Sequence, residues 1–327
     1  MPQSDVYFAN EFIGGERMSK RHLKAVLRSL GLLDFARRPF ETLKTSSLNL
    51  RMKLFPGNHT VPFAGKEVGF PIYDAHTFHW FVRYRGQNHN GWHEPSLTKF
   101  FEDMCHEKRT LLDIGAHLGY FSLLFSSRPE NVSYAIELDP VNFEYLEKVA
   151  HDTEGVDGTV KTFNVGFGAE KSRKFLKVRS SNTMTSLALA REEPMADEEW
   201  KPVEVVTLDQ FVADNGISPD IMKMDVEGFE YAVWNGGKAT IEKYRPVMAI
   251  EIHTPVLKKQ AVDIDGFFSE IRNLGYRIFS FPEHRSKSPK DLVEIEGPLK
   301  LDNYDIVCLP TVPADSASRA NEPAAAR

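Results

Sequence analysis

Cysteine is scarce in this chain, which has only Cys105 and Cys308 among its 327 residues. Two cysteines so far apart provide no disulfide framework, and such sparse use is typical of a reducing compartment. The chain also lacks an uncharged apolar run near the ~20 residues that a membrane-spanning helix needs. Its first residues, Met-Pro-Gln-Ser-Asp, show no charged segment followed by an apolar one, the mark of a secretory signal. These absences predict a cytoplasmic protein with no membrane span.

An excess of basic residues is missing as well. The chain has 40 Lys and Arg against 46 Asp and Glu, a formal net charge of -6. A general nucleic-acid binder normally carries a basic surface, so we expect no nucleic-acid partner. A content of 42% hydrophobic and 26% charged residues is ordinary for a globular protein, and the length suits one substantial domain with an added segment. The sequence leaves the oligomeric state open.

Three regions are expected from the composition and the hydrophobic periodicity of the chain. Residues 1–95 form an N-terminal α+β extension, with a helix over 19–36 and short strands over 61–84, which we interpret as a cover for the substrate. The helix has a basic face that suits a membrane surface or an acidic partner, but packing on its own domain is the favoured interpretation. Residues 96–310 form the main domain. Residues 311–327 lack periodicity and are predicted to be a disordered tail.

From residue 109 onward, segments typical of strands alternate with segments typical of helices. Such alternation predicts an α/β domain with a mainly parallel sheet and helices on both of its faces. A polar stretch over residues 170–200 interrupts the alternation. Strands are expected at 110–114, 132–137, 160–167, 220–225, 247–253, 277–281 and 304–309, and helices at 120–127, 141–150, 228–243 and 264–274.

The turn after the first of these strands lacks two glycines of the dinucleotide-binding pattern Gly-x-Gly-x-x-Gly. Residues 115–120 read Gly-Ala-His-Leu-Gly-Tyr, so His117 and Tyr120 replace glycines that would admit a pyrophosphate. Glu137 ends the next strand, 24 positions after Asp113 (137 − 113), where a carboxylate can accept hydrogen bonds from ribose hydroxyls. Asp113 at the turn suits a cationic ligand. S-adenosylmethionine is a nucleoside that carries a sulfonium and an amino group, and it fits this pattern.

Two signatures carry a resemblance to a known family. The first is Asp-Ile-Gly-Ala-His-Leu-Gly-Tyr-Phe-Ser over 113–122, with Ile-Glu-Leu-Asp-Pro over 136–140. The second is Val-Thr-Leu-Asp-Gln-Phe over 206–211, followed by Lys-Met-Asp-Val-Glu-Gly over 223–228. With these motifs the chain resembles the FkbM family of methyltransferases over about residues 92–255, beginning near Trp-His-Glu-Pro at 92–95.

The resemblance implies a class I methyltransferase sheet, Rossmann-like, with seven strands of which the last is antiparallel. It also implies an S-adenosylmethionine-dependent O-methyltransferase that acts on a hydroxyl of a sugar, a glycan or a natural product. His117 departs from the family, which commonly has Asn there. By match to the family's motifs and strand ends, the residues expected to hold the cofactor are Asp113, Gly115, His117, Gly119, Glu137, Asn164 and Gly166.

Candidate catalytic residues follow two neighbouring strands. Asp225 ends one, and Glu251 and His253 end the other, so the three are expected to meet at the carboxyl edge of the sheet. Methyl transfer to a hydroxyl requires alignment of the acceptor and removal of its proton, or a Lewis acid. Asp225 or His253 is a candidate base. Alternatively, Asp225, Glu251 and His253 hold Mg²⁺, a version that we favour slightly less.

Several assignments have a structural alternative. Glu227 is more readily a helix cap than a catalyst, and Lys223 is more readily an ion-pair partner. Residues 180–186 are either a loop beside the substrate or a surface connection. For the whole chain, a catalytically silent module that binds S-adenosylmethionine and a nicotinamide-dependent dehydrogenase remain as alternatives to the methyltransferase.

Overall fold

The computed structural model describes residues 59–78, 80–81, 88–177, 190–195, 199–283, 285–297 and 303–311. The chain divides into two compact units, Met1–Pro56 and Gly57–Arg327, and all described residues belong to the second. The expected helix over 19–36, the polar segment 180–186 and residues 312–327 of the expected tail lie outside the described residues. In the described part, no helix is long and apolar enough to cross a membrane.

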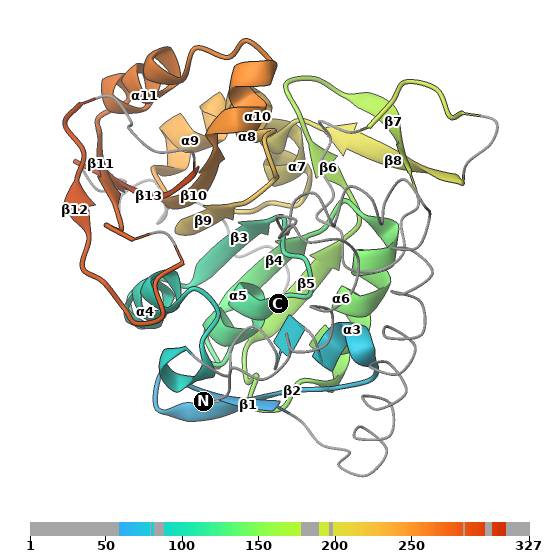
Figure 1. Ribbon diagram of the computed structural model, residues 1–327, viewed down its shortest axis with the longest axis vertical. Helices are drawn as coiled ribbons and strands as arrows, with labels where there is room; N and C mark the ends of the chain where they lie inside the picture. Colours follow the sequence, from blue (N-terminus) through green and yellow to red (C-terminus); the bar gives the residue numbers. More distant parts are fainter. Residues whose placement is uncertain are drawn as a thin grey trace, which may run out of the picture. The chain divides into compact units, whose positions relative to one another are not determined.

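A mixed sheet forms the centre of this unit (Figure 1). Its strands β9 and β10 are buried along their whole length, as expected for strands covered on both faces. The strands are β3 (Thr110–Ile114), β4 (Val132–Ile136), β5 (Thr159–Phe163), β9 (Ile221–Met224), β10 (Val247–His253), β11 (Tyr276–Ser280), β12 (Val293–Glu294) and β13 (Asn303–Pro310).

The strand order is β12-β11-β13-β10-β9-β3-β4-β5. The strands from β10 to β5 pair in parallel, whereas β13 inserts antiparallel between β10 and β11. This confirms the class I methyltransferase sheet with its last strand antiparallel, and the two-residue β12 adds an eighth strand at the edge. The chain runs outward from β3 to β5 and then returns to β9 on the other side of β3. Ligands of open α/β sheets bind at such a switch point.

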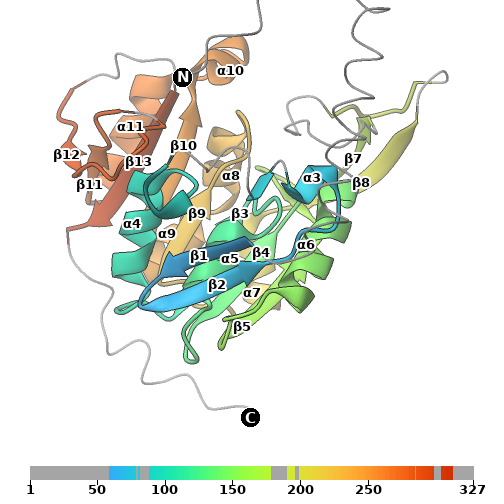
Figure 2. The same cartoon turned by 60° about the horizontal axis from the view of Figure 1, so that its bottom comes forward.

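Helices cover both faces of the sheet (Figures 1 and 2). Neighbouring residues of a strand point to opposite faces, so Leu112 packs with the helices of one face and Leu111 with those of the other. The helices of the first face are α7 (Leu208–Asp214), α8 (Glu230–Gly236), α9 (Lys238–Tyr244), α10 (Thr254–Lys259) and α11 (Ile264–Asn273), and those of the second are α4 (Pro95–Met104), α5 (Tyr120–Phe125) and α6 (Pro140–Asp152).

A hairpin from the N-terminal side joins the second face. Strands β1 (His59–Phe63) and β2 (Lys66–Phe70) pair antiparallel, and their buried side chains pack with those of α4 and α5. The short helices α3 (Ala75–Phe78) and η2 (His89–Gly91) follow in the chain. The short strands expected over 61–84 are therefore confirmed in the hairpin.

Two expected elements are wrong in their extent. The strand predicted over 160–167 ends at Phe163, because Gly166–Phe167 (β6) pairs with a different sheet that contains β7 (Ser172–Lys177) and β8 (Trp200–Val206). The polar composition of residues 170–200 concealed β7, whose residues are mostly only half-buried. The helix predicted over 228–243 is two helices, α8 and α9, which meet at Gly237.

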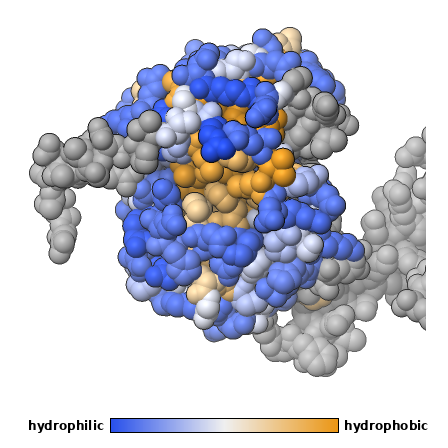
Figure 3. Space-filling view, turned by 90° about the vertical axis from the view of Figure 1, so that its left-hand side faces the viewer, coloured by the Kyte–Doolittle hydropathy of each residue, from blue (hydrophilic) through white to orange (hydrophobic). Residues whose placement is uncertain are grey.

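The edge of the main sheet at β12 is short and charged. Glu294 of this strand pairs with Arg277 of β11, which blunts an edge that offers unpaired backbone groups. Val293 beside it is 54% exposed. The side of the molecule that faces left in Figure 1 shows one hydrophobic area framed by hydrophilic side chains (Figure 3).

Trp234 in α8 provides a test of the packing on the first face. Its side chain is fully buried, contacts the ring of Phe267 and donates from Nε1 to Glu270 Oε2 at 2.9 Å. We expect Trp234→Ala to lower the free energy of unfolding by about 3–5 kcal/mol, because it leaves a large cavity. The exposed Met195 is the control, and Met195→Ala should change the free energy of unfolding by less than about 0.5 kcal/mol. Urea denaturation of both variants measures the difference; a loss below about 1 kcal/mol for Trp234→Ala would contradict this packing.

Candidate active site

A cavity of about 540 Å³ opens at the carboxyl ends of β3, β4, β9 and β10. This is the switch point of the sheet, where a ligand is expected. Six of the ten predicted site residues line it, namely Gly115, His117, Glu137, Gly166, Asp225 and Glu251. The other four, Asp113, Gly119, Asn164 and His253, lie behind its wall.

Gly115 fixes the turn that forms one wall of the cavity. Its φ is +80°, and a Cβ there would lie 1.8 Å from the carbonyl oxygen of Asp225. The backbone N–H groups of Gly115 and Ala116 both donate to the carbonyl of Ile136 at 2.9 Å. Only glycine permits this approach, so the turn after β3 and the end of β9 lie directly against each other.

Glu137 lies at the end of β4 with its carboxylate on the cavity. Its Oε2 accepts from the N–H of His117 and its Oε1 from the N–H of Asp139, each at 2.8 Å. Each oxygen retains a lone pair for a ligand hydroxyl. Burial raises the pKa of Glu137 to about 7, although the two hydrogen bonds oppose the rise.

Aromatic side chains close the cavity above the turn. The indole Nε1 of Trp80 donates to Nδ1 of His117, and the ring of His76 lies 6.0 Å from that of His117. Trp80 and His76 both line the cavity. Neither was predicted as a site residue, because the aromatic residues of 61–84 carry no motif that separates a ligand wall from a core.

Gly166 lies on the cavity in a wall that is mostly apolar. Leu138, Phe167 and Phe229 line this part together with Val165. Asn164, two residues earlier, points elsewhere: its Nδ2 donates to the carbonyls of Glu137 at 2.8 Å and Leu138 at 3.0 Å. Asn164 therefore holds the backbone that presents Glu137 and Leu138.

Asp113 is buried beside the cavity rather than on its wall. Ser122 Oγ donates to its Oδ2 at 2.7 Å, and Nζ of Lys223 lies 3.9 Å from its Oδ1. The two residues are direct partners in the pairing of β3 with β9. Burial raises the pKa of Asp113, while Lys223 and Ser122 lower it. Gly119 also acts locally: with φ +82° it begins α5.

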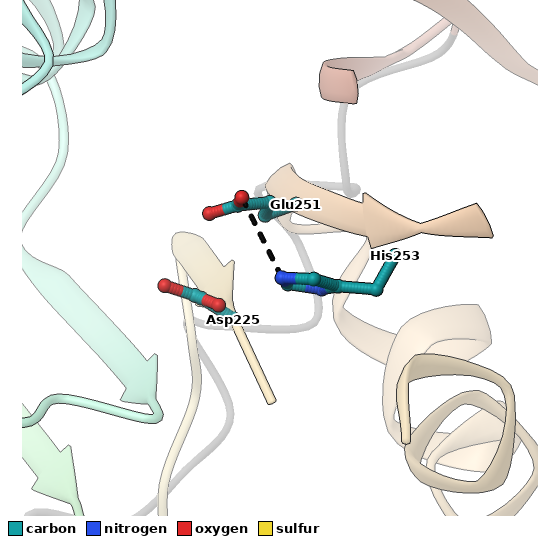
Figure 4. Close-up of side chains that lie close together, drawn as sticks. All are labelled: Asp225, Glu251 and His253. Carbon is teal, nitrogen blue, oxygen red and sulfur yellow. Dashed lines mark ion pairs between the residues drawn. The ribbon is translucent and has the colours of Figure 1, made fainter. Parts of the chain in front are cut away.

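Asp225, Glu251 and His253 converge at the ends of β9 and β10 (Figure 4). One ligand atom of each lies within 4.8 Å of those of the other two, and His253 Nε2 is 3.5 Å from Glu251 Oε1. Nζ of Lys223 lies 3.6 Å from Asp225 Oδ2. The convergence expected from the strand ends is therefore present, with Lys223 as a buried cation at its side.

Both ring nitrogens of His253 face carboxylates. Nδ1 lies 2.8 Å from Oε1 of Glu230, which is fully buried, and Nε2 lies 3.1 Å from Oε2 of Glu227. Glu227 reaches this position with φ +53°, a backbone conformation that the sequence does not predict for a glutamate. Burial alone would lower the pKa of His253, but these two hydrogen bonds raise it to about 11. The ring is thus an imidazolium near neutral pH.

The carboxylates around this imidazolium differ in their charge. Burial raises the pKa of Asp225, while Lys223 lowers it. Burial raises the pKa of Glu251 further, because Asp225, Glu94 and Asp305 add their negative charges. Near neutral pH, Asp225 is therefore the ionised member of the pair and Glu251 the protonated one.

The remaining wall comes from two segments, the first of which belongs to the N-terminal extension that we expected to cover the substrate. One carries His93 and Glu94, whose side chains form an ion pair of 3.3 Å between Nε2 and Oε1. The other spans residues 285–287. Residues 92–95 contained a signal, since the family resemblance begins at this Trp-His-Glu-Pro sequence, but residues 285–287 contained none.

Comparison with known proteins gives the chain its family. The methyltransferase FkbM domain matches residues 113–278, just over half of the chain. No curated protein matches. A methyltransferase FkbM from Methylobacillus flagellatus KT is 18% identical, with a TM-score of 0.40 over 62% of this chain and 44% of that chain. The protein thus spans less than half the length of that structure.

Two further solved structures are similar to parts of the chain. An S-adenosylmethionine-dependent O-methyltransferase from Thermotoga maritima is 10% identical, with a TM-score of 0.36 over 78% of both chains. The N-terminal domain of human METTL16, in complex with S-adenosylhomocysteine, is 13% identical, with a TM-score of 0.36 over 65% of this chain and 68% of that chain. The family assignment rests on the domain match, which removes the dehydrogenase alternative: the protein belongs to the FkbM family of S-adenosylmethionine-dependent methyltransferases.

Proposed function

We propose that the protein is an O-methyltransferase that methylates a hydroxyl of a sugar, a glycan or a natural product. The observation that carries the proposal is one cavity with two chemically different ends. Glu137 and the Gly115 turn line the end that we assign to the cofactor, and Asp225 and Glu251 line the end that we assign to the acceptor. The first end suits a nucleoside and the second suits a hydroxyl that must lose a proton.

The residues present fit S-adenosylmethionine. Glu137 offers a buried carboxylate to ribose hydroxyls, and Gly115 lines the cavity without a side chain. Leu138, Phe167 and Phe229 offer apolar surface for the adenine. The cofactor supplies a methyl group bonded to a positively charged sulfur. Asp225, on the same cavity, provides a negative charge that suits this sulfonium.

Asp225 is the base that we propose for the acceptor hydroxyl. Its side chain reaches the cavity and is ionised near neutral pH, whereas His253 is already protonated and bound at both nitrogens. Glu251, with its raised pKa, can donate a hydrogen bond that orients the acceptor oxygen. His253 then positions Glu227 and Glu251 rather than exchanging a proton itself.

A magnesium ion fits these residues poorly. Two carboxylates suit Mg²⁺, but both nitrogens of His253 have carboxylate partners, and imidazolium is no ligand. Lys223 already places a positive charge 3.6 Å from Asp225 Oδ2. We therefore derive no step through a metal ion.

Cofactor binding tests the first end of the cavity. We expect S-adenosylhomocysteine to bind and NAD not to bind in calorimetric titrations. Glu137→Gln should weaken the binding of S-adenosylhomocysteine by about 1.5–3 kcal/mol, because hydrogen bonds to a charged acceptor are lost. This corresponds to a roughly ten- to hundredfold lower affinity. Glu147→Gln on the exposed side of α6 is the control and should leave affinity unchanged. Equal affinity in a folded Glu137→Gln protein would show that this carboxylate does not bind the ribose.

Turnover tests the second end. Asp225→Asn should reduce the rate of methyl transfer about 10²-fold or more, while the affinity for S-adenosylhomocysteine changes less, because the amide cannot accept the proton. Asp214→Asn on the surface of α7 is the matched control. The assay measures S-adenosylhomocysteine release with a panel of glycosides as acceptors. A folded Asp225→Asn enzyme with the wild-type rate would refute the assignment, and an enzyme inert on every acceptor would favour the silent binding module.

The pH dependence and the response to a chelator separate the metal-free version from the magnesium version. A base must be deprotonated to act, so the rate should rise with pH through the raised pKa of Asp225, about 6. Dialysis against EDTA should leave the rate unchanged. Reversible loss of turnover on chelation, restored by Mg²⁺, would instead assign the acids to an ion.

A further inference from the structure

Two segments outside the family match form the wall beside Asp225 and Glu251. The FkbM domain covers residues 113–278, whereas Asn88, His93 and Glu94 precede it and residues 285–287 follow it. The part of the cavity that a cofactor leaves to the acceptor is thus bordered by residues that the family domain does not specify.

These two segments hold each other in place. The N–H of His89 in η2 donates to the carbonyl of Lys287 at 2.8 Å, and the N–H of Lys290 donates to Ser96 Oγ at 3.0 Å. Because η2 and the first turn of α4 support it, the segment from 285 to 290 has a defined place on the cavity rather than a chance one.

The second of these segments is basic. Residues 285–290 read Arg-Ser-Lys-Ser-Pro-Lys and contain no acid. Lys290 forms an ion pair with Glu283 at 3.4 Å. Arg285 and Lys287 are exposed residues that line the cavity. Arg285 is near enough to lower the pKa of Glu94, yet His93 contributes more to that lowering.

The cavity is therefore lined by the acidic side chains of Glu94, Asp225 and Glu251 and by the basic side chains of Arg285 and Lys287. An acceptor with its hydroxyl at Asp225 would place any anionic group away from the acids, on the side of Arg285 and Lys287. Guanidinium and ammonium groups bind carboxylate and phosphate well. We propose that Arg285 and Lys287 bind an anionic group, a carboxylate or a phosphate, of the methyl acceptor. The proposal rests on the proposed function, since it concerns the acceptor of that reaction.

Saturation-transfer NMR with three sugars tests the proposal, with S-adenosylhomocysteine present at saturation. Glucuronic acid and glucose 6-phosphate are the anionic probes, and glucose is the neutral one. We expect wild type to bind both anionic probes at least tenfold more tightly than glucose. The double variant Arg285→Gln/Lys287→Gln should lose that preference, with its affinity for glucose and for S-adenosylhomocysteine unchanged. Arg285→Lys, which keeps the charge, should retain most of it.

The matched control is Lys258→Gln/Lys259→Gln, which removes two exposed positive charges from α10. It should leave all three sugars unaffected. Equal binding of the three probes by wild type, binding of none, or an unchanged preference in the double variant would overturn the proposal. The proposal would also be overturned if the double variant lost binding to a single-stranded RNA oligonucleotide but bound the three sugars as wild type does. Failure to bind S-adenosylhomocysteine is a separate result, because it would refute the proposed function itself.

Discussion

The missing side chain of Gly115 is the constraint on which the site depends. A Cβ at this position would lie 1.8 Å from the carbonyl oxygen of Asp225, so no other residue allows the turn after β3 and the end of β9 to meet. That contact holds the end of β9 against the turn after β3, which also donates to the carbonyl of Ile136 beside Glu137. The N–H of Asp225 donates to the carbonyl of Ile114 at 2.9 Å and completes the junction. The lack of a Cβ at position 115 thus allows the two ends of the cavity to lie against each other.

Buried charges on each side of this junction are arranged in compensating groups. Lys223 lies 3.9 Å from Asp113 and 3.6 Å from Asp225, and His253 lies between Glu227 and Glu230. Buried ion pairs contribute little net stability, because desolvation offsets their attraction, but removing one partner leaves a costly unpaired charge. Their effect here is on position: Lys223 links Asp113 of β3 to Asp225 after β9, and His253 holds the turn that carries Glu227 and Glu230. Asp225 keeps its Oδ2 near Lys223 while its side chain still reaches the cavity.

The sequence predicted the strand ends better than the directions of their side chains. The alternation of strands and helices located β3, β4, β9 and β10 within one or two residues, and the motifs placed Gly115, Glu137, Asp225 and Glu251 on one cavity. Asp113 was expected at the ligand because it precedes the turn. Its side chain instead pairs with Lys223 across β3 and β9 and is buried inside the protein. A motif does not reveal which face a side chain takes when both faces of the sheet are buried.

His253 shows the same limit in chemical terms. Its place at the end of β10 was predictable, but its role depends on Glu227, which adopts φ +53°, and on Glu230, and the carboxylates of both face its two nitrogens. The wall that we assign to the acceptor could not be predicted from the sequence for a different reason. It joins residues 88–95 to residues 285–287, which are almost 200 positions apart, through a hydrogen bond between His89 and Lys287. Since this wall lies outside the matched domain, the proposed acceptor contacts depend on residues other than those of the Gly115 junction and Glu137.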